Sequence, residues 1–242
     1  MNTNRKLIGS GAVSRIYVED DIAYKTYPTE YPLDWVAYEV NIQQEIIEHT
    51  NLRIPKMELL KDAKEIRMDF IDGYTLAERI RKEKYKLFLE DFVDIQLSIY
   101  EYSDLKLENA HEIFKKQIKE SKLGEEFKII GLSALEKIEK KNILCHLDIH
   151  FLNIMYAHSE YYIIDWINAK LGNPVLDIAR TYVVLKQYAQ RQANKYLKMI
   201  VQKGDFKITD IESAIRVMAI LRLLEEDSEN FKKKLLEMIY TK

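Results

Sequence analysis

The order of apolar and polar positions in the N-terminal part of the chain predicts short strands. Residues 15–18 (RIYV) and 22–27 (IAYKTY) are β-branched and aromatic runs separated by the polar residues EDD, a pattern typical of a hairpin. Residues 57–60 (MELL) and 65–70 (EIRMDF) have the same character, with a short polar stretch between them. We therefore predict two hairpins.

A helix is predicted between the two hairpins. In DWVAYEVNIQQEIIEHT, apolar side chains recur at spacings of three and four residues, as they do on one face of an α-helix. Asp34 stands at the start of this run, where its carboxylate can cap the first turn. The N-terminal part of the chain therefore combines strands with one long helix.

Helices dominate from Tyr74 onward. The apolar residues within 88–100 form one helical stripe, and those within 211–221 form another. Residues 142–165 interrupt this pattern, because ILCHL, NIMYA and YYIID are short apolar runs broken by polar turns. We expect a small β insertion at this point of a helical region.

The character of the chain changes near Gly73, in the sequence IDG, where glycine lets the backbone bend freely. We predict an α+β protein with two lobes. Residues 1–72 form a small β-rich N-terminal lobe, and residues 73–242 form a larger, mainly helical C-terminal lobe. No internal repeat or low-complexity segment suggests a different organisation.

Composition permits a large buried core. The chain has 242 residues, of which 47% are hydrophobic, enough for one large domain or two small lobes without covalent staples. Its one cysteine, Cys145, cannot form an internal disulfide, and the opening MNTNRKLIGSG lacks the apolar core of a signal peptide. We therefore expect a cytoplasmic protein.

The charges of the chain are nearly balanced. Lysine and arginine number 37, aspartate and glutamate number 39, and the net charge of −2 attracts neither nucleic acid nor an anionic membrane. Apolar runs such as VMAILRLL are interrupted well short of the roughly 20 residues that a spanning helix needs. We expect a monomer or weak dimer that binds no nucleic acid and no membrane, and that holds any anionic ligand locally.

A candidate phosphate-binding loop lies near the N-terminus. In LIGSGAVSRIYV, Gly9 and Gly11 bracket Ser10, so the backbone can turn tightly and present its N–H groups to a phosphate. The next predicted strand carries Lys25 among apolar neighbours, where its ammonium can meet α- and β-phosphates as a point charge. Such a lysine needs a carboxylate partner. The following helix offers Glu39 and Glu45, and we favour Glu39 because it comes early in the helix.

A second candidate motif lies at residues 145–155, CHLDIHFLNIM. His146, Asp148 and Asn153 satisfy H-x-D-x-x-x-x-N, the spacing of a kinase catalytic loop. In that loop the aspartate accepts the proton of the attacking hydroxyl and the asparagine binds Mg²⁺. Asp165 follows the apolar run YYII, and a carboxylate at the end of a buried strand is well placed to hold a bridging metal ion.

These segments resemble the aminoglycoside phosphotransferase and choline kinase superfamily, which has a protein-kinase-like fold. The catalytic loop typical of that superfamily is close to HGDLHPGN, and the corresponding residues here are HLDIHFLN, followed by IIDWINAKLGNPVLDIARTY. The resemblance implies that Asp148 is the catalytic residue and that Asn153 and Asp165 bind Mg²⁺. It also implies that Lys25 and Glu39 act at the phosphates, and that the backbone of Met68, Asp69 and Phe70 forms the hinge that meets adenine.

The resemblance covers residues 7–185 and includes two further positions. Asp177 matches a structural aspartate that braces the catalytic loop, and His150 matches a histidine that follows the catalytic aspartate. The chain departs from the pattern at Leu147, where glycine is usual, and at Phe151 and Leu152, which replace proline and glycine. These larger side chains affect the shape of the loop but remove no proton-handling or metal-binding group.

The expected activity is that of a small-molecule kinase. Residues 166–176, between Asp165 and Asp177, are too few for the long activation segment on which a protein kinase binds a peptide, and Trp-Ile stands where protein kinases have Phe-Gly. We therefore expect transfer of the γ-phosphoryl group of ATP or GTP, with Mg²⁺, to a hydroxyl of a small molecule such as an aminoglycoside, a choline-like amino alcohol or a sugar.

Two other interpretations remain open at this point. The first is a nucleotide-binding pseudokinase with a regulatory role, which the intact set of catalytic groups argues against. The second is a zinc or iron enzyme, because His146, Asp148 and His150 alternate and would share one face of an extended strand. The metal-enzyme interpretation leaves the glycine loop, Lys25 and Asp165 without a role.

Overall fold

The computed structural model describes residues 5–11, 13–225 and 228–241. The chain divides into two compact units. One contains the residues up to Glu83 together with Leu152–Ile167, and the other contains Lys84–Phe151 and the residues from Asn168 onward. The sequence assigned residues 73–83 and Leu152–Ile167 to the C-terminal lobe, whereas in the structure both segments belong to the first unit, where Tyr74–Thr75 pairs with a strand of Leu152–Ile167.

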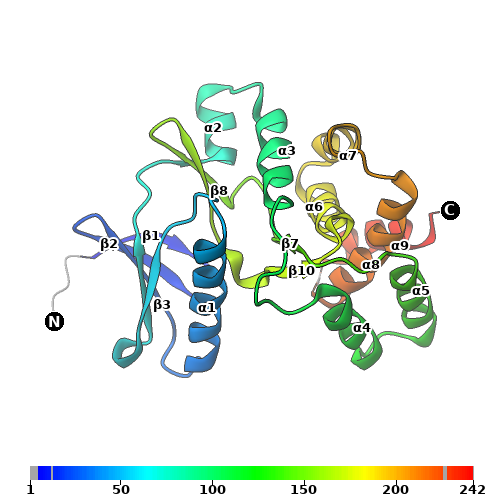
Figure 1. Cartoon of the computed structure of the whole chain (residues 1–242), viewed down its shortest axis with the longest axis horizontal. Coiled ribbons are helices and arrows are strands. Elements are labelled where there is room, and N and C mark those ends of the chain that lie inside the picture. The colour runs from blue at the N-terminus through cyan, green and yellow to red at the C-terminus, as the bar shows by residue number, and fades with distance from the viewer. Residues whose placement is uncertain (1–4, 12, 226–227, 242) are drawn as a thin grey trace. The chain divides into compact units, whose positions relative to one another are not determined.

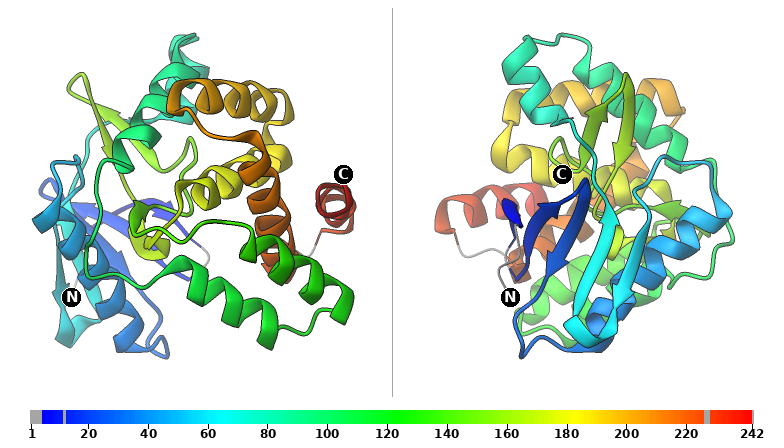
Figure 2. Two further views of the ribbon diagram at one scale, coloured as in Figure 1. Left: turned by 45° about the vertical axis from the view of Figure 1, so that its right-hand side comes forward. Right: turned by 90° about the vertical axis from the view of Figure 1, so that its left-hand side faces the viewer.

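The first unit contains a five-stranded antiparallel sheet with strand order β1-β2-β3-β5-β4 (Figure 1). Figure 2 shows its strands in blue and cyan. The two predicted hairpins are confirmed as β2–β3 and β4–β5, and a short 3-10 helix, η1 (Lys61–Ala63), connects β4 to β5. The strands are β1 (Lys6–Ser10), β2 (Arg15–Glu19), β3 (Ile22–Thr26), β4 (Met57–Leu60) and β5 (Glu65–Asp69).

The predicted helix between the hairpins is confirmed as α1 (Leu33–His49). Val36 and Val40 of this helix pack against Ile66 of β5 and form the core of the sheet's inner face. The prediction that Asp34 caps the helix is wrong. The N-cap position is Pro32, which supplies no side-chain hydrogen bond, and Asp34 lies within the first turn, where its negative charge favours the helix dipole.

A second, three-stranded antiparallel sheet completes the first unit. Strand β8 (Ile154–Ala157) pairs with β6 (Tyr74–Thr75) on one side and with β9 (Glu160–Ile163) on the other. The predicted β insertion is thus confirmed, but the sequence did not predict β6. Helix α2 (Leu76–Glu83) follows β6 directly.

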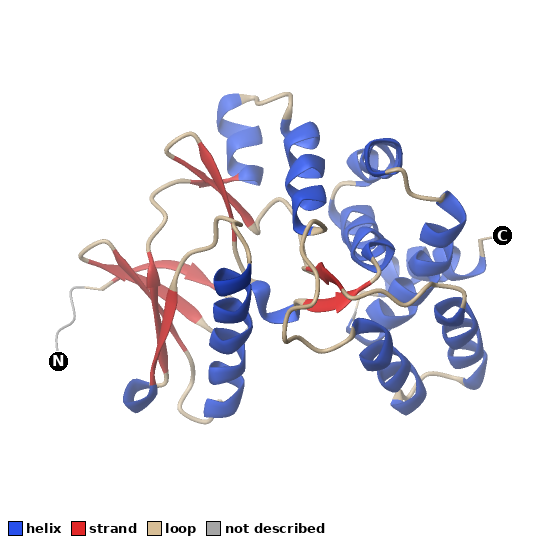
Figure 3. Ribbon diagram, viewed as in Figure 1, coloured by secondary structure: helices blue, strands red, loops and turns tan. Residues whose placement is uncertain are grey.

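The second unit is mainly helical, as the stripes predicted (Figure 3). The two predicted stripes lie on α3 and α8, and α8 packs against α5, α6 and α9. Strand β7 (Ile143–Cys145) pairs with β10 (Lys170–Gly172) in a two-stranded antiparallel sheet. The helices are α3 (Phe88–Ile99), α4 (Ala110–Glu120), α5 (Glu125–Glu136), α6 (Pro174–Tyr188), α7 (Gln190–Gly204), α8 (Ile208–Glu225) and α9 (Glu229–Tyr240).

The structure confirms the predicted α+β fold class, with a β-rich unit and a mainly helical one. None of the helices in the described part of the chain is both long enough and apolar enough to cross a membrane.

Gly73 serves a different purpose from the one the sequence suggested. None of the glycines that the structure describes has a positive φ, so free bending is not what this position requires. A Cβ at Gly73 would lie 2.3 Å from the carbonyl oxygen of Tyr156 and 2.8 Å from the Cβ of Ala157. The glycine therefore allows the chain to approach β8 closely just before it pairs as β6.

We predict that Gly73→Ala lowers the free energy of unfolding by about 1–3 kcal/mol, because the added methyl group overlaps backbone atoms that cannot move aside cheaply. Denaturant unfolding followed by circular dichroism measures the change. Gly9→Ala is the matched control in the same unit, since a Cβ there would meet only Ile16 at an ordinary 3.6 Å. Equal stability of the two variants would contradict this explanation of Gly73.

Candidate active site

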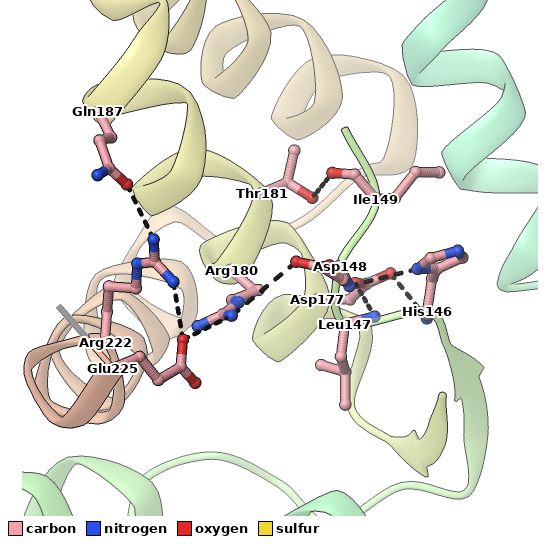
Figure 4. A network of polar contacts seen from close by, with 10 residues as sticks. All are labelled: His146, Leu147, Asp148, Ile149, Asp177, Arg180, Thr181, Gln187, Arg222 and Glu225. Carbon is pink, nitrogen blue, oxygen red and sulfur yellow. Dashed lines mark hydrogen bonds and ion pairs between the residues drawn. The ribbon is translucent and has the colours of Figure 1, made fainter. Parts of the chain in front are cut away.

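The predicted catalytic loop follows β7 and is held by a buried carboxylate on α6. Asp177 is fully buried and accepts a hydrogen bond of 2.7 Å from the backbone N–H of Leu147 and one of 3.3 Å from that of His146 (Figure 4). The Tyr100 hydroxyl donates a third, of 3.1 Å. The structure therefore confirms the bracing role of Asp177.

Leu147 has a left-handed backbone conformation, with φ of 62°. Glycine adopts this region without steric cost, and a non-glycine residue there carries strain of about 1–3 kcal/mol. The Leu147 side chain is buried, and its N–H donates the 2.7 Å hydrogen bond to Asp177. Packing and this hydrogen bond together hold a leucine in a conformation that suits the glycine usual in the related superfamily.

A second set of hydrogen bonds holds the catalytic loop at Ile149, directly after Asp148. The Thr181 hydroxyl of α6 donates to the carbonyl oxygen of Ile149 at 3.2 Å, and the Gln96 amide of α3 donates to Thr181 at 3.2 Å. The same amide nitrogen donates to Tyr100 at 2.8 Å, and Tyr196 of α7 donates to the Gln96 carbonyl at 2.7 Å. This buried network joins three helices to the loop and gives it a defined shape.

Phe151, the residue in place of the superfamily's proline, packs into an aromatic cluster. Its ring lies edge-on to Phe92 at a centroid distance of 4.9 Å and to Phe88 at 5.7 Å. Such pairs contribute beyond simple burial of area. Leu152, by contrast, is largely exposed. Of the three departures, two are thus explained by packing within the second unit.

Asp148 lies at the surface of this braced loop. Its side chain is 23% exposed, and its carboxylate lies 3.9 Å from the guanidinium of Arg180 on α6. Its backbone N–H donates to Nδ1 of His146 at 3.3 Å, so the proton of a neutral His146 ring is on Nε2. His146 is fully buried and thus has a local structural role.

The structure does not favour the zinc or iron interpretation. Among the residues it describes, no group of three or more His, Cys, Asp or Glu side chains is placed to hold a metal ion. His146, Asp148 and His150 alternate along the chain but do not form such a group, because the chain here is a loop whose left-handed Leu147 breaks the extended geometry.

Lys25 and Glu39 are brought together in the first unit. Lys25 of β3 donates to the Glu39 carboxylate of α1 at 2.6 Å, and both side chains are largely buried. The Tyr27 hydroxyl donates to the other oxygen of Glu39 at 2.5 Å. Glu45, the alternative partner, instead lies 3.4 Å from His49. The preference for Glu39 as partner of Lys25 is confirmed.

Tyr27 is a member of this cluster that sequence reasoning missed. Burial raises the pKa of its phenol, and the negative charges of Glu39 and of Asp165 raise it further. The available signal was the alternation of side chains on a strand, which places Tyr27 on the same face as Lys25.

The two predicted Mg²⁺ ligands stand at adjoining ends of β8 and β9. Asn153 is buried directly before β8, and its carbonyl oxygen accepts a hydrogen bond of 3.0 Å from the N–H of Ile164. Asp165 comes next and is exposed, with a left-handed φ of 65°. The following Trp166 is buried and donates to the carbonyl of Ile163 at 3.1 Å, which anchors the turn. One amide and one carboxylate suit Mg²⁺, which takes few protein ligands besides phosphate oxygens.

The candidate phosphate loop is a tight hairpin turn. Gly9 and Ser10 lie within β1, and the N–H of Gly11 donates to the carbonyl of Ser14 at 2.8 Å. A register shift between Leu7 and Gly9 marks an irregularity in the strand. The backbone N–H of Gly11 is therefore used inside the turn.

The predicted hinge residues lie at and just after the end of β5, which pairs with β3 and β4. Met68 and Asp69 are the last residues of β5, and Phe70 comes next. The N–H of Lys56 donates to the Asp69 carboxylate at 2.9 Å, and the N–H of Asp69 donates to the carbonyl of Lys56 at 3.0 Å. Met68 and Asp69 also line a cavity of about 190 Å³.

Comparison with protein families identifies the family of this chain. Residues 58–202 match the model of the ecdysteroid kinase-like family, and this match includes Asp148, Asn153, Asp165 and Asp177. The chain belongs to this family. It is thereby a member of the kinase-like phosphotransferases, and the suspected superfamily is confirmed. No curated protein matches the chain.

Solved structures of small-molecule kinases share the fold of this family member. A choline/ethanolamine kinase family protein from Mesorhizobium loti is 12% identical, with a TM-score of 0.66 over 99% of this chain and 89% of the other. Choline kinase LicA from Streptococcus pneumoniae is 13% identical, with a TM-score of 0.65 over 98% and 93%. The ADP-bound aminoglycoside phosphotransferase APH(2'')-Ib is 15% identical, with a TM-score of 0.64 over 98% and 92%. The kinase-like fold is therefore shown.

The buried Asp177 makes the folding stability of this kinase-like protein depend on pH, and a variant can separate its contribution from that of the other groups. Burial raises the pKa of Asp177 above its ordinary 3.8, and the charge of His146 and the three hydrogen bonds offset only part of this effect. Folding therefore favours the protonated carboxyl group. The contribution of Asp177 to the free energy of unfolding is therefore fully present below pH 3.8, and it is lost as the pH rises through the pKa of the folded state.

We predict that the unfolding free energy of the wild type, minus that of Asp177→Asn, decreases as the pH rises from 3.8 to 7. The asparagine does not titrate, and the other titratable groups are common to both proteins, so the difference isolates residue 177. Denaturant unfolding at a series of pH values measures it. A difference that stays constant or grows with pH would contradict the raised pKa.

Proposed function

We propose that this protein transfers the γ-phosphoryl group of ATP or GTP to a hydroxyl group of a small molecule. The observation that carries the proposal is the largely buried 2.6 Å ion pair between Lys25 and Glu39. Active kinases require a strand lysine paired with a helix glutamate to fix the nucleotide phosphates. Membership of the ecdysteroid kinase-like family and nucleotide-bound structural neighbours such as APH(2'')-Ib support it.

In the proposed reaction, the acceptor oxygen forms a bond to the γ-phosphorus while the bond from that phosphorus to the β–γ bridging oxygen breaks. The nucleoside diphosphate leaves, and the hydroxyl proton passes to the carboxylate of Asp148. Because the transition state is loose, catalysis comes mainly from positioning and electrostatics. The hydrogen bonds that fix the loop backbone at Leu147 and Ile149 therefore support catalysis by holding Asp148 in place.

Asn153 and Asp165 would hold Mg²⁺, since an amide oxygen and a single carboxylate leave the remaining positions to phosphate oxygens and water. The bound ion would neutralise phosphate charge. Lys25, held by Glu39 and Tyr27, would place its ammonium group at the α- and β-phosphates.

The proposed acceptor class is a small hydroxylated molecule. Residues 166–176 are taken up by η2 (Trp166–Asn168), β10 and the start of α6, so the part of the chain where protein kinases carry an activation segment is already structured. The neighbours include a choline kinase and an aminoglycoside phosphotransferase. Both act on small molecules, which supports this class without selecting one member.

We predict that Asp148→Asn lowers turnover by about 10²- to 10⁴-fold, because the asparagine cannot accept the hydroxyl proton. Nucleotide affinity should stay within about twofold of the wild type, since Asp148 is not proposed to touch the nucleotide before transfer. Turnover is measured with an acceptor panel and coupled detection of the nucleoside diphosphate. Full activity of the variant would remove Asp148 from the mechanism.

Asp165→Ala is the contrasting variant, because it removes a proposed metal ligand and not the proton acceptor. We expect it to weaken binding of the Mg²⁺–nucleotide complex by at least about tenfold in titration calorimetry, as loss of a metal contact does. Unchanged affinity would refute the metal assignment of Asp165. Nucleotide binding by the wild type without transfer to any acceptor or to water would instead support the pseudokinase interpretation.

A further inference from the structure

A small cavity in the second unit adjoins the catalytic loop. Its volume is about 90 Å³, well below the roughly 300–1,000 Å³ of sites that enclose a whole drug-sized ligand. It can therefore receive one end of a small molecule. Leu147 of the loop forms one wall, and Met218 and Leu221 of α8 form another. Leu147 is the neighbour of Asp148 in the chain, so the cavity lies beside the loop that carries Asp148.

The charged groups of the cavity are Lys170, Arg180 and Glu225. Arg180 is the most constrained of them, with a side chain only 12% exposed. Its Nη2 lies 2.9 Å from the Glu225 carboxylate and 3.9 Å from that of Asp148 (Figure 4). Its Nε is buried and has no hydrogen-bond partner among the residues that the structure describes.

The carboxylate of Glu225 is already compensated. The same oxygen of Glu225 that accepts from Arg180 also accepts from Arg222 at 2.9 Å. Burial alone would raise the pKa of Glu225, but the two arginines outweigh it and hold this pKa below its ordinary value. Glu225 therefore stays ionised and shares its charge between two guanidinium groups, which leaves little attraction for a cationic ligand.

Two cationic side chains and one shared carboxylate thus line the cavity. Lys170 lies 3.2 Å from Glu108, a residue that is half exposed and is not among the described residues lining the cavity. A positively charged acceptor group would meet Lys170 and Arg180 at close range. A negatively charged group would meet the same two cations, both of which attract it.

We infer that the acceptor of this kinase carries an anionic group, a carboxylate or a phosphate, that binds Arg180 in this cavity. The inference rests on the proposed function, because Asp148 must take the proton of the acceptor hydroxyl. Since Arg180 and Asp148 are 3.9 Å apart, the anionic group and the reacting hydroxyl are separated by only a few bonds. Small hydroxy acids and hydroxylated phosphate esters fit this description, whereas aminoglycosides and choline do not.

Binding measurements with matched probes test the inference. Glycerate, glycerol 3-phosphate, glycerol and ethanolamine are similar in size and carry a carboxylate, a phosphate, no charge and a positive charge. Each is titrated into the full-length protein by calorimetry, with and without Mg²⁺ and a non-hydrolysable ATP analogue, and each is assayed for phosphoryl transfer. We expect at least one anionic probe to bind about ten- to hundredfold more tightly than glycerol, the range for a hydrogen bond to a charged group. The stronger of the two anions identifies the group.

Variants assign the preference to one side chain. Arg180→Gln should abolish the anion preference, and Arg180→Lys, which keeps the charge but not the planar fork, should retain part of it. Arg216→Gln is the matched control, because Arg216 is an arginine of α8 that donates to the backbone carbonyl of Thr241 and is not among the described residues that line the cavity. It should keep the preference. Circular dichroism establishes that each variant is folded, and the lysine variant decides the matter if the glutamine variant is not.

The outcomes separate the inference from the proposed function. Preferred binding of ethanolamine, no binding of either anionic probe, or an equal loss in the Arg216→Gln control overturns the inference. Arg180-dependent binding of an anionic probe without phosphoryl transfer upholds the anion site and counts against the proposed kinase reaction. Transfer to ethanolamine alone upholds the kinase reaction and overturns the anion site.

Discussion

The candidate catalytic loop depends on one buried carboxylate. Asp177 receives the N–H groups of His146 and Leu147 and the hydroxyl of Tyr100, and it has no exposure to solvent. Burying a carboxylate is unfavourable, as its raised pKa records, and the hydrogen bonds compensate only in part. At neutral pH the buried carboxylate therefore lowers the stability of the fold. Its hydrogen bonds nevertheless hold the backbone that precedes Asp148 in one defined conformation.

The departures of this chain from the superfamily pattern show how a loop can keep its shape with different residues. Leucine at position 147 occupies a backbone conformation that glycine would adopt freely. Its buried side chain and its hydrogen bond to Asp177 offset the strain, while Phe151 anchors the far end of the loop against Phe88 and Phe92. Shape is maintained by packing here, where the usual sequence relies on the freedom of glycine and the stiffness of proline.

The sequence was a good guide wherever a feature is local. Hairpins, the amphipathic helix over 33–49 and the H-x-D spacing all depend on residues close together in the chain, so periodicity and motif spacing revealed them. The Lys25–Glu39 pair could also be predicted, because strand and helix are neighbours in the chain. The role of Tyr27 was not predicted, because it depends on the direction of the hydroxyl group toward Glu39, and the sequence pattern does not give that direction.

Features made by distant residues could not be read from the sequence. The pairing of β6 with β8, the reason for Gly73 and the grouping of Arg180 with Glu225 each join segments far apart in the chain, and no local pattern specifies them. The prediction that Asp34 caps α1 was wrong for a different reason. Asp34 is a good capping residue, but Pro32 fixes the backbone as the N-cap, so the helix begins two positions earlier than a cap at Asp34 would allow.

The contact between Gly73 and β8 links two parts of the first unit that have separate tasks. Tyr156 and Ala157, the residues pressed against Gly73, belong to the strand that starts directly after Asn153. Because a side chain has no room at that contact, the segment around Gly73 fixes the position of one end of β8, and the proposed magnesium-binding amide of Asn153 directly precedes the other end.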